Sequence, residues 1–435
     1  MSTSTIHTSE PRKVAVASLV GTTVEWYDFF IYGTAAALVF PRLFFPEVGP
    51  FLGTVLAFAT FGAGFLARPL GGIVFGHFGD RLGRKPMLVV SLLTMGVATV
   101  LIGLLPTHAT VGVLAPVLLV LLRLVQGIAV GGEWGGAVLL AVEHAPPGRR
   151  GYFGSFPQAG AAAGTVLATA AFYLVALLPD DQFLAWGWRL PFLASAVLVV
   201  VGLYVRLRIA ESPSFRRLAQ RQEKARLPLV EALRTHPRQV VLVAGAFLVQ
   251  SAFAYIFIAY LATYATRVVG VSRDTILLII ALSGVVSFVM HLYFGSLSDR
   301  FGRKPVYLTG VVAMGVLIFP AFALIDTGVF VLMLLGHVMI FGVAQAISGG
   351  ATATMFAEMF RADVRYTGAS VGYQLAGVAG AALSPIIAAS LFEATGTGYA
   401  IAGYLAAMAV VSLVSVMLIG ETRDRDLADA SHASE

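Results

Sequence analysis

The sequence predicts an all-α membrane protein of twelve transmembrane helices, arranged as two similar six-helix bundles. Three observations lead to this fold class. The chain of 435 residues is 58% hydrophobic and only 12% charged, and its mean hydropathy is +0.85, which is far too apolar for a soluble domain. Apolar runs long enough to cross about 30 Å of hydrocarbon recur along the chain. One short basic loop occurs twice, at 76–86 and 295–305.

The apolar runs are interpreted as helices because they lack the period-two alternation of apolar and polar residues found in barrel strands. The predicted spans are 16–40, 51–75, 87–105, 112–141, 152–178, 187–207, 239–267, 274–297, 306–325, 329–356, 367–394 and 398–420. A polar N-terminal segment ending in Arg12 and Lys13 precedes the first run. That run is too long for a signal peptide, so we expect an uncleaved first span.

Lysine and arginine fall mainly in loops on one side of the predicted spans, which the positive-inside rule places in the cytoplasm. The other side keeps only Arg42, Arg189, Arg267 and Arg273. Both termini are therefore expected to be cytoplasmic. The formal charge of +6 follows from this topology and does not indicate a nucleic-acid partner. Because the chain has no cysteine, disulfides and cysteine-based metal or redox chemistry are excluded.

The repeated loop divides the chain into halves. GHFGDRLGRKP at 76–86 and GSLSDRFGRKP at 295–305 share the Asp-Arg pair, the glycine after it, and Arg-Lys-Pro. The same offset places Gln126 on Gln345. The expected domains are an N-terminal six-helix bundle at 1–206, a cytoplasmic linker at 207–238, and a C-terminal six-helix bundle with a short cytoplasmic tail at 239–435. The charge pattern of the linker indicates one or two surface helices.

Both loops resemble the signature loop of the major facilitator superfamily. The stretches GTTVEWYDFFIYG at 21–33, ARPLGG at 67–72, RLVQGIAVGGEWGGA at 123–137 and ESPSF at 211–215 are similar to its metabolite:proton symporter branch. Members of that branch carry osmolytes such as betaine, or organic acids such as α-ketoglutarate and shikimate. The resemblance implies the superfamily fold and a proton-coupled importer in a bacterial inner membrane. We expect a monomer in the lipid bilayer, with no cofactor besides the proton as coupling ion.

Five ionisable residues lie within predicted spans: Glu25, Asp28, Arg68, Arg123 and Glu133. Each costs about 2.5–3.5 kcal/mol at a helix centre, so such groups normally face a bundle interior or cavity and have a function. Structural ion pairing within the first half is the alternative. Glu25 and Asp28 are three residues apart and share a helix face, so one of the two carboxyls can hold a proton. Glu25, Asp28 and Glu133 are therefore the proton-coupling candidates.

Guanidinium groups bind carboxylates through a bidentate fork, so Arg123 suits an anionic substrate. Arg68 either serves the substrate or braces the loop that follows it. The second half has no matching charges and carries amides and aromatic side chains instead. The full set of substrate-binding candidates is Arg68, Arg123, Gln126, Trp134, Tyr27, Gln250, Tyr255, Gln345 and Gln374. For the aromatic members, simple packing is an equal alternative.

By the same resemblance, the two basic loops are expected to close the cytoplasmic side when the site faces outward. Asp80 can pair with Arg84, and Asp299 with Arg303 repeats that pair. Glu143 with Arg150, and Glu358 with Arg365, are candidate partners. The predicted gate comprises Gly76, Asp80, Arg81, Gly83, Arg84, Glu143, Arg150, Asp299, Arg300, Gly302, Arg303, Glu358 and Arg365. The alternative is that these charges only orient the protein in the membrane.

The sequence does not predict an enzyme. It contains no nucleotide-binding loop and no H-E-x-x-H motif, and its one G-x-S-x-G pattern, at 368–372, falls inside a predicted span. The predicted function is proton-coupled import of a small organic metabolite by alternating access, with a carboxylate favoured by the two intramembrane arginines. A betaine or proline symporter is an alternative, which the short tail after Gly420 weakens. A non-transporting membrane sensor on the same fold is a further alternative.

Overall fold

The computed structural model describes residues 10–82, 84–131, 133–208, 233–361 and 364–425. Only the backbone is described for residues 10, 73, 76–82, 84–85, 88, 134, 208 and 366. Most of the predicted linker, the predicted gate residue Gly83 and the side chains of several other predicted gate residues therefore lie outside the described part. The division of the chain at 207–238 stays a prediction.

The described chain is almost entirely helical. In the first half the main helices are α1 (Glu10–Leu38), α3 (Pro50–Leu82), α4 (Arg84–Leu104), α6 (Leu114–Val130), α7 (Trp134–Glu143), α8 (Arg150–Gly154), α9 (Phe156–Ala176) and α11 (Leu190–Arg208), joined by the short α2 (Phe40–Leu43), α5 (His108–Val111) and α10 (Asp180–Ala185). In the second half they are α14 (Pro237–Tyr255), α15 (Leu261–Tyr264), α16 (Arg273–Phe301), α17 (Arg303–Ile325), α18 (Phe330–His337), α19 (Gln345–Glu358), α20 (Arg365–Ala376), α21 (Ser384–Thr395) and α22 (Gly398–Met417).

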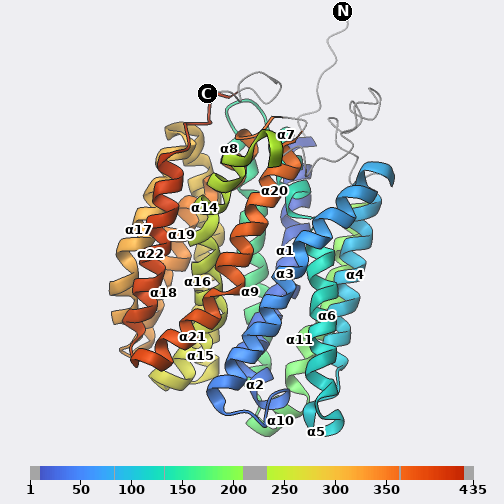
Figure 1. Cartoon of the computed structure of the whole chain (residues 1–435), viewed down its shortest axis with the longest axis vertical. Coiled ribbons are helices and arrows are strands. Elements are labelled where there is room, and N and C mark those ends of the chain that lie inside the picture. The colour runs from blue at the N-terminus through green and yellow to red at the C-terminus, as the bar shows by residue number, and fades with distance from the viewer. Residues whose placement is uncertain (1–9, 83, 132, 209–232, 362–363, 426–435) are drawn as a thin grey trace, which may run out of the picture.

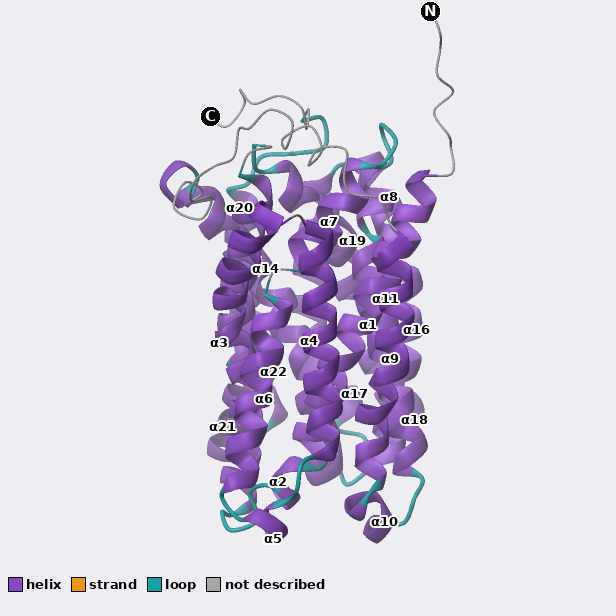
Figure 2. Cartoon of the chain, turned by 90° about the vertical axis from the view of Figure 1, so that its right-hand side faces the viewer, coloured by secondary structure: helices purple, strands orange, loops and turns teal. Residues whose placement is uncertain are grey.

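The predicted fold class is confirmed. Eleven helical stretches are long and apolar enough to cross a membrane, and the shorter apolar helix Val89–Leu104 within α4 supplies the twelfth span. The helices run along the long axis of the molecule and are joined by short loops at its two ends (Figure 2). In Figure 1, α3, α4, α6 and α11 lie on the right and α17, α18, α19 and α22 on the left. Between these groups, α9 of the first half packs against α16 of the second.

Several spans of the second half contain π-helical turns. These turns are Ile256–Tyr260 and Ala265–Val269 around α15, Val338–Ala344 between α18 and α19, and Gly377–Ala382 between α20 and α21. π-turns interrupt the regular hydrogen-bond ladder and occur frequently at functional sites. Three of the four contribute residues to the pocket described below.

Helices α3 and α6 approach each other closely because glycines lie at their contact. A Cβ atom at Gly127 of α6 would run into the backbone carbonyl of Gly64 in α3. Small residues at such contacts let membrane helices approach backbone to backbone. This contact brings together the two helices that carry Arg68 and Arg123.

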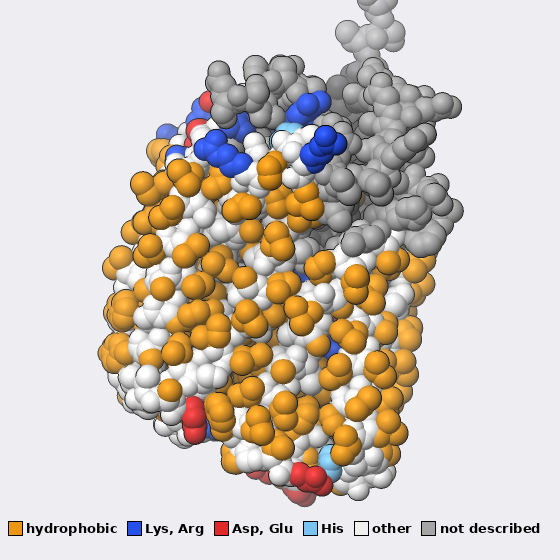
Figure 3. All heavy atoms as spheres, in the orientation of Figure 1, with side chains coloured by type: hydrophobic (Ala, Val, Ile, Leu, Met, Phe, Trp, Pro, Cys, Tyr) orange, Lys and Arg blue, Asp and Glu red, His pale blue; other side chains and the backbone are white. Residues whose placement is uncertain are grey.

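The surface has a belt of apolar side chains between two polar ends (Figure 3). Exposed members of the belt include Leu70, Val97, Leu174, Val197 and Val316. Lysine and arginine side chains gather at the end where α7, α8 and α20 begin or end (Figures 1 and 3). We call this the basic end and define it by Arg150, Arg300, Lys304, Arg365 and Arg423. The far end, with Arg189, Arg267 and Arg273, is called the opposite end.

Candidate functional site

A pocket lies between the helices of the two halves. First-half side chains reach it from α1, α3 and α9, and second-half side chains from α14, α16, α19 and α20. Its lining includes Trp26, Phe30, Phe65, Arg68, Gln158, Thr165, Phe247, Gln250, Ser251, Tyr255, Ser287, His291, Gln345 and Tyr373. Membrane transport proteins built from two repeats bind substrate at such a seam.

Arg68 is the only arginine or lysine among the described residues that line this pocket. Its guanidinium carbon lies 4.4 Å from the ring centroid of Phe29 and 4.4 Å from that of Phe65. The side chain is buried, and its Nε has no hydrogen-bond partner among the described residues. Aromatic faces attract a guanidinium and leave its N–H edge available to a planar anion. Arg68 is thus positioned to bind a carboxylate in the pocket.

Other polar atoms around the pocket are also buried without a hydrogen-bond partner among the described residues. They are Trp26 Nε1, Tyr255 Oη and Gln345 Oε1. A buried polar atom that lacks a partner costs about 1–3 kcal/mol, so several in one pocket call for a polar occupant. The set contains donors from both halves and an acceptor from the second half. Hydroxyl groups, which donate and accept, would satisfy such a set.

Tyr255 of the second half inserts among aromatic rings of the first half. Its ring centroid lies 5.0 Å from that of Phe65, 5.5 Å from that of Phe61 and 6.4 Å from that of Trp26. The π-helical turn Ile256–Tyr260 follows it directly. This aromatic contact crosses the seam beside the pocket, so it must separate whenever the two halves part there.

Arg123 does not line the pocket but lies behind it, inside the first half. Its guanidinium carbon is 4.0 Å from the Phe29 ring centroid and 4.2 Å from that of Tyr32. Arg123 Nη1 donates to Gln126 Oε1 at 3.0 Å, and Gln126 Nε2 donates to Thr99 Oγ1 at 2.7 Å. This arrangement makes Arg123 part of an internal network rather than a ligand-contacting group in the closed pocket.

The same network ends on Asp28. Thr99 Oγ1 donates to Asp28 Oδ2 at 3.0 Å, and Ser195 Oγ donates to Asp28 Oδ1 at 2.5 Å. Asp28 is buried between α1, α4 and α11. A chain of side-chain hydrogen bonds therefore connects Asp28 with Arg123 through Thr99 and Gln126. The two charged residues predicted separately from the sequence belong to one unit.

Glu133 forms an ion pair with Arg206 of α11 and also accepts a hydrogen bond from Ser91 Oγ at 3.1 Å. Both charged partners are buried. Arg206 lies at the end of the sixth predicted span and was not among the ionisable residues singled out within the spans. The ion pair with Glu133 holds it inside the first half.

Among the described residues of the first half, the buried acids are Glu25, Asp28 and Glu133 and the buried arginines are Arg68, Arg123 and Arg206. Their formal charges sum to zero when all are ionised. Arg68 and Arg206 are the cations that act electrostatically on Glu25. Among the described residues of the second half, no aspartate, glutamate, lysine or arginine lines the pocket. The Gln250 amide there is hydrogen-bonded to Thr352 at 2.9 Å.

Two other predicted substrate residues occupy different surroundings. Tyr27 points away from the pocket and donates through its hydroxyl to the Pro191 carbonyl at 2.7 Å. Gln374 spans the seam, donating to the Gly131 carbonyl at 3.3 Å, while its Oε1 is buried without a partner among the described residues. The side chain of Trp134 lies outside the described part of the chain.

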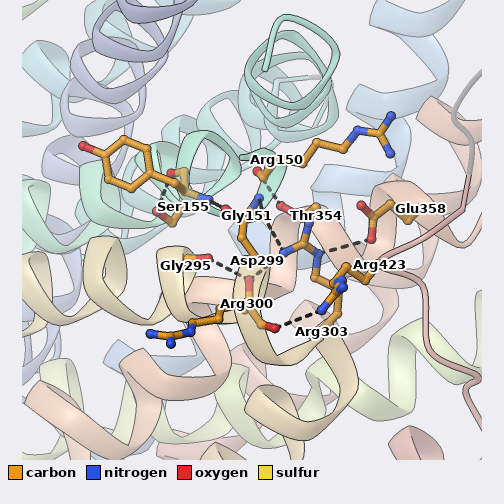
Figure 4. A network of polar contacts seen from close by, with 12 residues as sticks. Arg150, Gly151, Ser155, Gly295, Asp299, Arg300, Arg303, Thr354, Glu358 and Arg423 are labelled. Carbon is orange, nitrogen blue, oxygen red and sulfur yellow. Dashed lines mark hydrogen bonds and ion pairs between the residues drawn. The ribbon is translucent and has the colours of Figure 1, made fainter. Parts of the chain in front are cut away.

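At the basic end, one carboxylate joins the halves. Asp299, near the end of α16, accepts hydrogen bonds from the backbone N–H groups of Gly151 at 2.7 Å and Tyr152 at 2.8 Å, in the first turn of α8 (Figure 4). Arg303 Nη1 holds the same carboxylate at 2.8 Å, and Arg303 Nε lies 3.4 Å from Glu358. An anion at unsatisfied N–H groups of a helix start is a favourable contact.

The acid–arginine pairing at this end differs from the candidate pairs in the sequence. Glu143 lies 3.9 Å from Arg365 across the seam, and Glu358 contacts Arg303 instead of Arg365. Arg150 donates to the backbone carbonyl of Arg425 at 3.0 Å. The difference arises because α7 and α20 of opposite halves meet here. Of the other predicted gate residues, Gly76, Asp80, Arg81, Gly83 and Arg84 have side chains outside the described part.

The segment after α22 also takes part in the basic end. Glu421 accepts hydrogen bonds from the backbone N–H groups of Arg303 at 2.9 Å and Lys304 at 3.1 Å, which open α17. Gly302, between α16 and α17, has φ +102°, and a Cβ there would lie 2.6 Å from Glu421 Oε2. Arg423 donates to the Arg300 carbonyl at 2.9 Å. These contacts fix residues 421–423 against the second copy of the repeated loop.

The opposite end is joined as well. Arg267 Nη1 donates to Thr54 Oγ1 at 2.7 Å, at the start of α3. Arg273 donates to the Ala176 and Leu178 carbonyls at 3.1 and 2.6 Å and pairs with Asp180. Both arginines belong to the second half and all their partners to the first. The structure therefore has inter-half contacts at both ends, with the pocket between them.

Comparison with known proteins identifies the group to which this architecture belongs. The family model of the sugar (and other) transporter family matches residues 13–232, and that of the major facilitator superfamily matches residues 242–434. The chain belongs to the major facilitator superfamily. Partially occluded, inward-open XylE, the xylose transporter from E. coli, has the same fold with a TM-score of 0.74 at 20% identity, covering 97% of this chain and 100% of that chain.

Several superfamily relatives match along nearly the whole chain. The inner membrane metabolite transport protein YhjE of Escherichia coli K12 is 44% identical, covering 96% of each chain. The shikimate transporter of the same organism is 43% identical, covering 96% of this chain and 97% of the relative. The glycine betaine/proline/ectoine/pipecolic acid transporter OusA of Dickeya dadantii is 35% identical, covering 97% and 86%. This superfamily member is therefore a multi-pass membrane transporter of metabolites and not an enzyme.

Proposed function

We propose that this transporter imports a small hydroxylated carboxylate together with protons, by alternating access between the two halves. The supporting observation is Arg68, a buried guanidinium that lines the inter-half pocket and whose Nε has no hydrogen-bond partner among the described residues. A single pocket arginine suits one carboxylate better than two. The unpartnered groups of Trp26, Tyr255 and Gln345 suit hydroxyls on the same solute. The relative named as a shikimate transporter carries a solute of this chemical type.

The basic end is proposed to face the cytoplasm, because arginine and lysine gather there and the positive-inside rule favours that side. The carrier then lies in the inner membrane as a monomer with both termini cytoplasmic. The contacts of Asp299 with Gly151 and Tyr152 close the cytoplasmic side when the pocket opens outward. The proton is the only other species required.

A zwitterionic osmolyte is the second candidate. Phe30, Phe65, Phe247, Tyr255 and Tyr373 surround the pocket with aromatic faces, and such faces attract a quaternary ammonium group. The relative named for glycine betaine and proline transport supports the same alternative. In this case Arg68 would hold the carboxylate of the zwitterion, and the rings its cationic end.

Uptake by proteoliposomes containing the purified chain tests these proposals. Labelled shikimate, glycine betaine and proline are supplied outside, under an imposed inward proton gradient. We expect shikimate to accumulate above its external concentration and the uptake to stop when a protonophore is added. Accumulation of betaine or proline, without accumulation of shikimate, would show that the substrate is a zwitterion. Binding of a solute without accumulation would instead indicate a sensor.

The requirement for the pocket cation is tested with Arg68→Gln in the same vesicles. Loss of the guanidinium is expected to reduce carboxylate binding by about two orders of magnitude, since hydrogen bonds to charged groups contribute about 1.5–3 kcal/mol each. Arg189→Gln is the matched control. It removes an arginine of the same half that binds the Gly103 and Leu105 carbonyls at the opposite end. Equal uptake by the wild type and Arg68→Gln would remove Arg68 from the binding site.

A further inference from the structure

Three buried acids are found among the described residues of the first half, and their surroundings distinguish them. Asp28 receives hydroxyl hydrogen bonds from Ser195 and Thr99 and is linked to Arg123. It belongs to an internal network that does not reach the pocket. The partners of Asp28 are therefore fixed within α1, α4, α6 and α11, and a ligand in the pocket does not displace them.

Glu133 also has fixed partners inside the first half. Arg206 pairs with it directly, and Ser91 donates a further hydrogen bond at 3.1 Å. Neither Glu133 nor Arg206 lines the pocket. Binding of a ligand in the pocket does not displace either partner, so it leaves this ion pair intact.

Glu25 differs because one of its cations also belongs to the pocket. It immediately precedes Trp26, which lines the pocket, and Arg68 and Arg206 act on it electrostatically. Glu25 in turn acts electrostatically on Tyr255 and Tyr373 of the second half. Arg206 is already paired with Glu133. Arg68 is thus the cation acting on Glu25 whose charge a carboxylate bound in the pocket would neutralise.

Glu25 and a bound carboxylate compete for the charge of Arg68, and this competition changes the charge balance of the first half. Among its described residues, the three buried acids and the three buried arginines balance when all are ionised. A bound monocarboxylate adds one negative charge to this buried set. An uncompensated charge inside a membrane protein is expensive, and a buried carboxyl avoids that cost by binding a proton. Protonation of one acid restores the balance.

We propose that Glu25 is the acid that takes up the coupling proton, and that Arg68 passes from Glu25 to the substrate carboxylate in the same step. The proton comes from the outer solution, forms the neutral carboxylic acid of Glu25, and leaves to the cytoplasm after the substrate departs and Arg68 returns. One proton then accompanies each monocarboxylate. This assignment rests on the proposed carboxylate symport, and selects Glu25 over Asp28 and Glu133.

Proton uptake during ligand binding tests the assignment directly. Shikimate is titrated into the purified full-length chain by calorimetry near neutral pH, in two buffers with different ionisation enthalpies. The difference between the two heats gives the number of protons bound per ligand. We expect about one proton for the wild type and none for Glu25→Gln. Asp28→Asn is the matched change three residues along the same helix. It is expected to bind about one proton per ligand, whatever its affinity for shikimate.

A second measurement needs no variant and so does not depend on whether Glu25→Gln folds. One proton with one monoanion carries no net charge. In wild-type proteoliposomes, a proton gradient should therefore drive shikimate accumulation, and a potassium–valinomycin potential of either sign should leave the rate unchanged. Glu25→Gln vesicles preloaded with shikimate should still exchange it with external label, because exchange needs no net proton transfer.

The outcomes separate this inference from the proposed function. Proton uptake by Glu25→Gln, or its loss in Asp28→Asn alone, overturns the assignment of Glu25. Acceleration of wild-type uptake by an inside-negative potential overturns the one-to-one ratio. In both cases proton-driven accumulation by the wild type still supports the symport. If wild-type protein neither binds nor accumulates shikimate, the proposed carboxylate function fails, and the assignment of Glu25 fails with it.

Discussion

At the scale of single residues, the buried ion pair between Glu133 and Arg206 shows how the first half accommodates charge. Both side chains are withdrawn from water, and Ser91 supplies an additional hydrogen bond to Glu133. Buried pairs contribute little net stability compared with apolar substitutes, but removing one partner leaves an unpaired charge in a low-dielectric interior. The effects of single and double replacements should therefore differ.

Replacing Arg206 with glutamine should destabilise the protein by about 3–5 kcal/mol, the usual cost of breaking a buried ion pair from one side. Glu133→Gln with Arg206→Gln should recover much of this loss, because no unpaired carboxylate remains at that position. Melting of the detergent-solubilised variants measures both effects. Melting of the single and double variants at the wild-type temperature would show that the pair has no structural role.

At the scale of elements, the junction between α16 and α17 depends on one glycine and one acid. The backbone of Gly302, with φ +102° and ψ 159°, lies in a region that residues with a Cβ rarely adopt. Glu421 lies against this turn and accepts the N–H groups that begin α17. The helix start is thereby capped by a side chain from the other end of the second half.

Gly302→Ala is expected to destabilise the protein by at least about 1–3 kcal/mol from backbone strain. Its new methyl group would also displace Glu421. Gly396→Ala is the matched control, since Gly396 also has a positive φ, of +68°, but nothing within 4 Å of an added Cβ. Thermal melting should rank the variants as wild type, then Gly396→Ala, then Gly302→Ala. Equal melting of the two variants would contradict the capping role of Glu421.

The contribution of Glu421 should depend on pH. Partial burial raises the pKa of its carboxyl, but backbone N–H donors of Arg303, Arg423, Thr422 and Lys304 together lower the pKa below its ordinary value. A lowered folded-state pKa gives stability that is complete above the unfolded pKa of about 4.3 and is lost as the pH falls through the folded pKa. Glu421→Gln should therefore melt below the wild type at pH 7.

The difference between the Glu421→Gln and wild-type melting temperatures should shrink as the pH is lowered below the ordinary glutamate range. Glu393→Gln, which changes an exposed glutamate of α21 at the opposite end, serves as the control. A gap that stays constant down to acid pH would show that the charge of Glu421 does not stabilise α17.

At the scale of the whole molecule, contacts at both ends enclose the pocket between the two halves. Alternating access requires one set of contacts to break while the other holds. At the basic end the main inter-half contact is made by the Asp299 carboxylate and the first N–H groups of α8. At the opposite end Arg267 and Arg273 bind α3 and the segment after α9. Weakening either set should shift the population towards the corresponding open state.

Asp299→Asn should open the basic end. The loss of charge-assisted hydrogen bonds is worth about 1.5–3 kcal/mol, which corresponds to roughly a tenfold or larger change in the ratio of closed to open molecules. The chain has no cysteine, so Ser155→Cys introduces a unique thiol at a buried position that contacts Gly295 across the seam. Maleimide labelling of that thiol should accelerate by a similar factor.

The control for this labelling experiment is Asp326→Asn, which removes an acid that accepts the Tyr264 hydroxyl at 2.6 Å within the second half. It should not change the labelling rate. If Asp299→Asn and Asp326→Asn label equally slowly, Asp299 does not hold the basic end closed.

Hydrophobic length made the twelve helices predictable, because crossing a bilayer is a local property of each segment. The same cost argument singled out the three buried acids of the first half and two of the three buried arginines found among its described residues. Arg206 was missed because it lies at the boundary of its apolar run, where sequence alone does not separate a buried arginine from one at the membrane surface. The contacts of Asp299 with Gly151 and of Glu143 with Arg365 were also missed, because they join segments far apart in the chain.

The groups that line the pocket are divided unequally across the seam. The guanidinium of Arg68 belongs to the first half, whereas Gln250, Tyr255 and Gln345 belong to the second. A solute that touches both sets keeps only one of them when the halves separate, so its affinity falls on opening even if neither half changes internally. A bulky analogue that binds Arg68 and prevents the second half from closing over it would therefore hold the carrier in an open form. Such an analogue would inhibit transport instead of being transported.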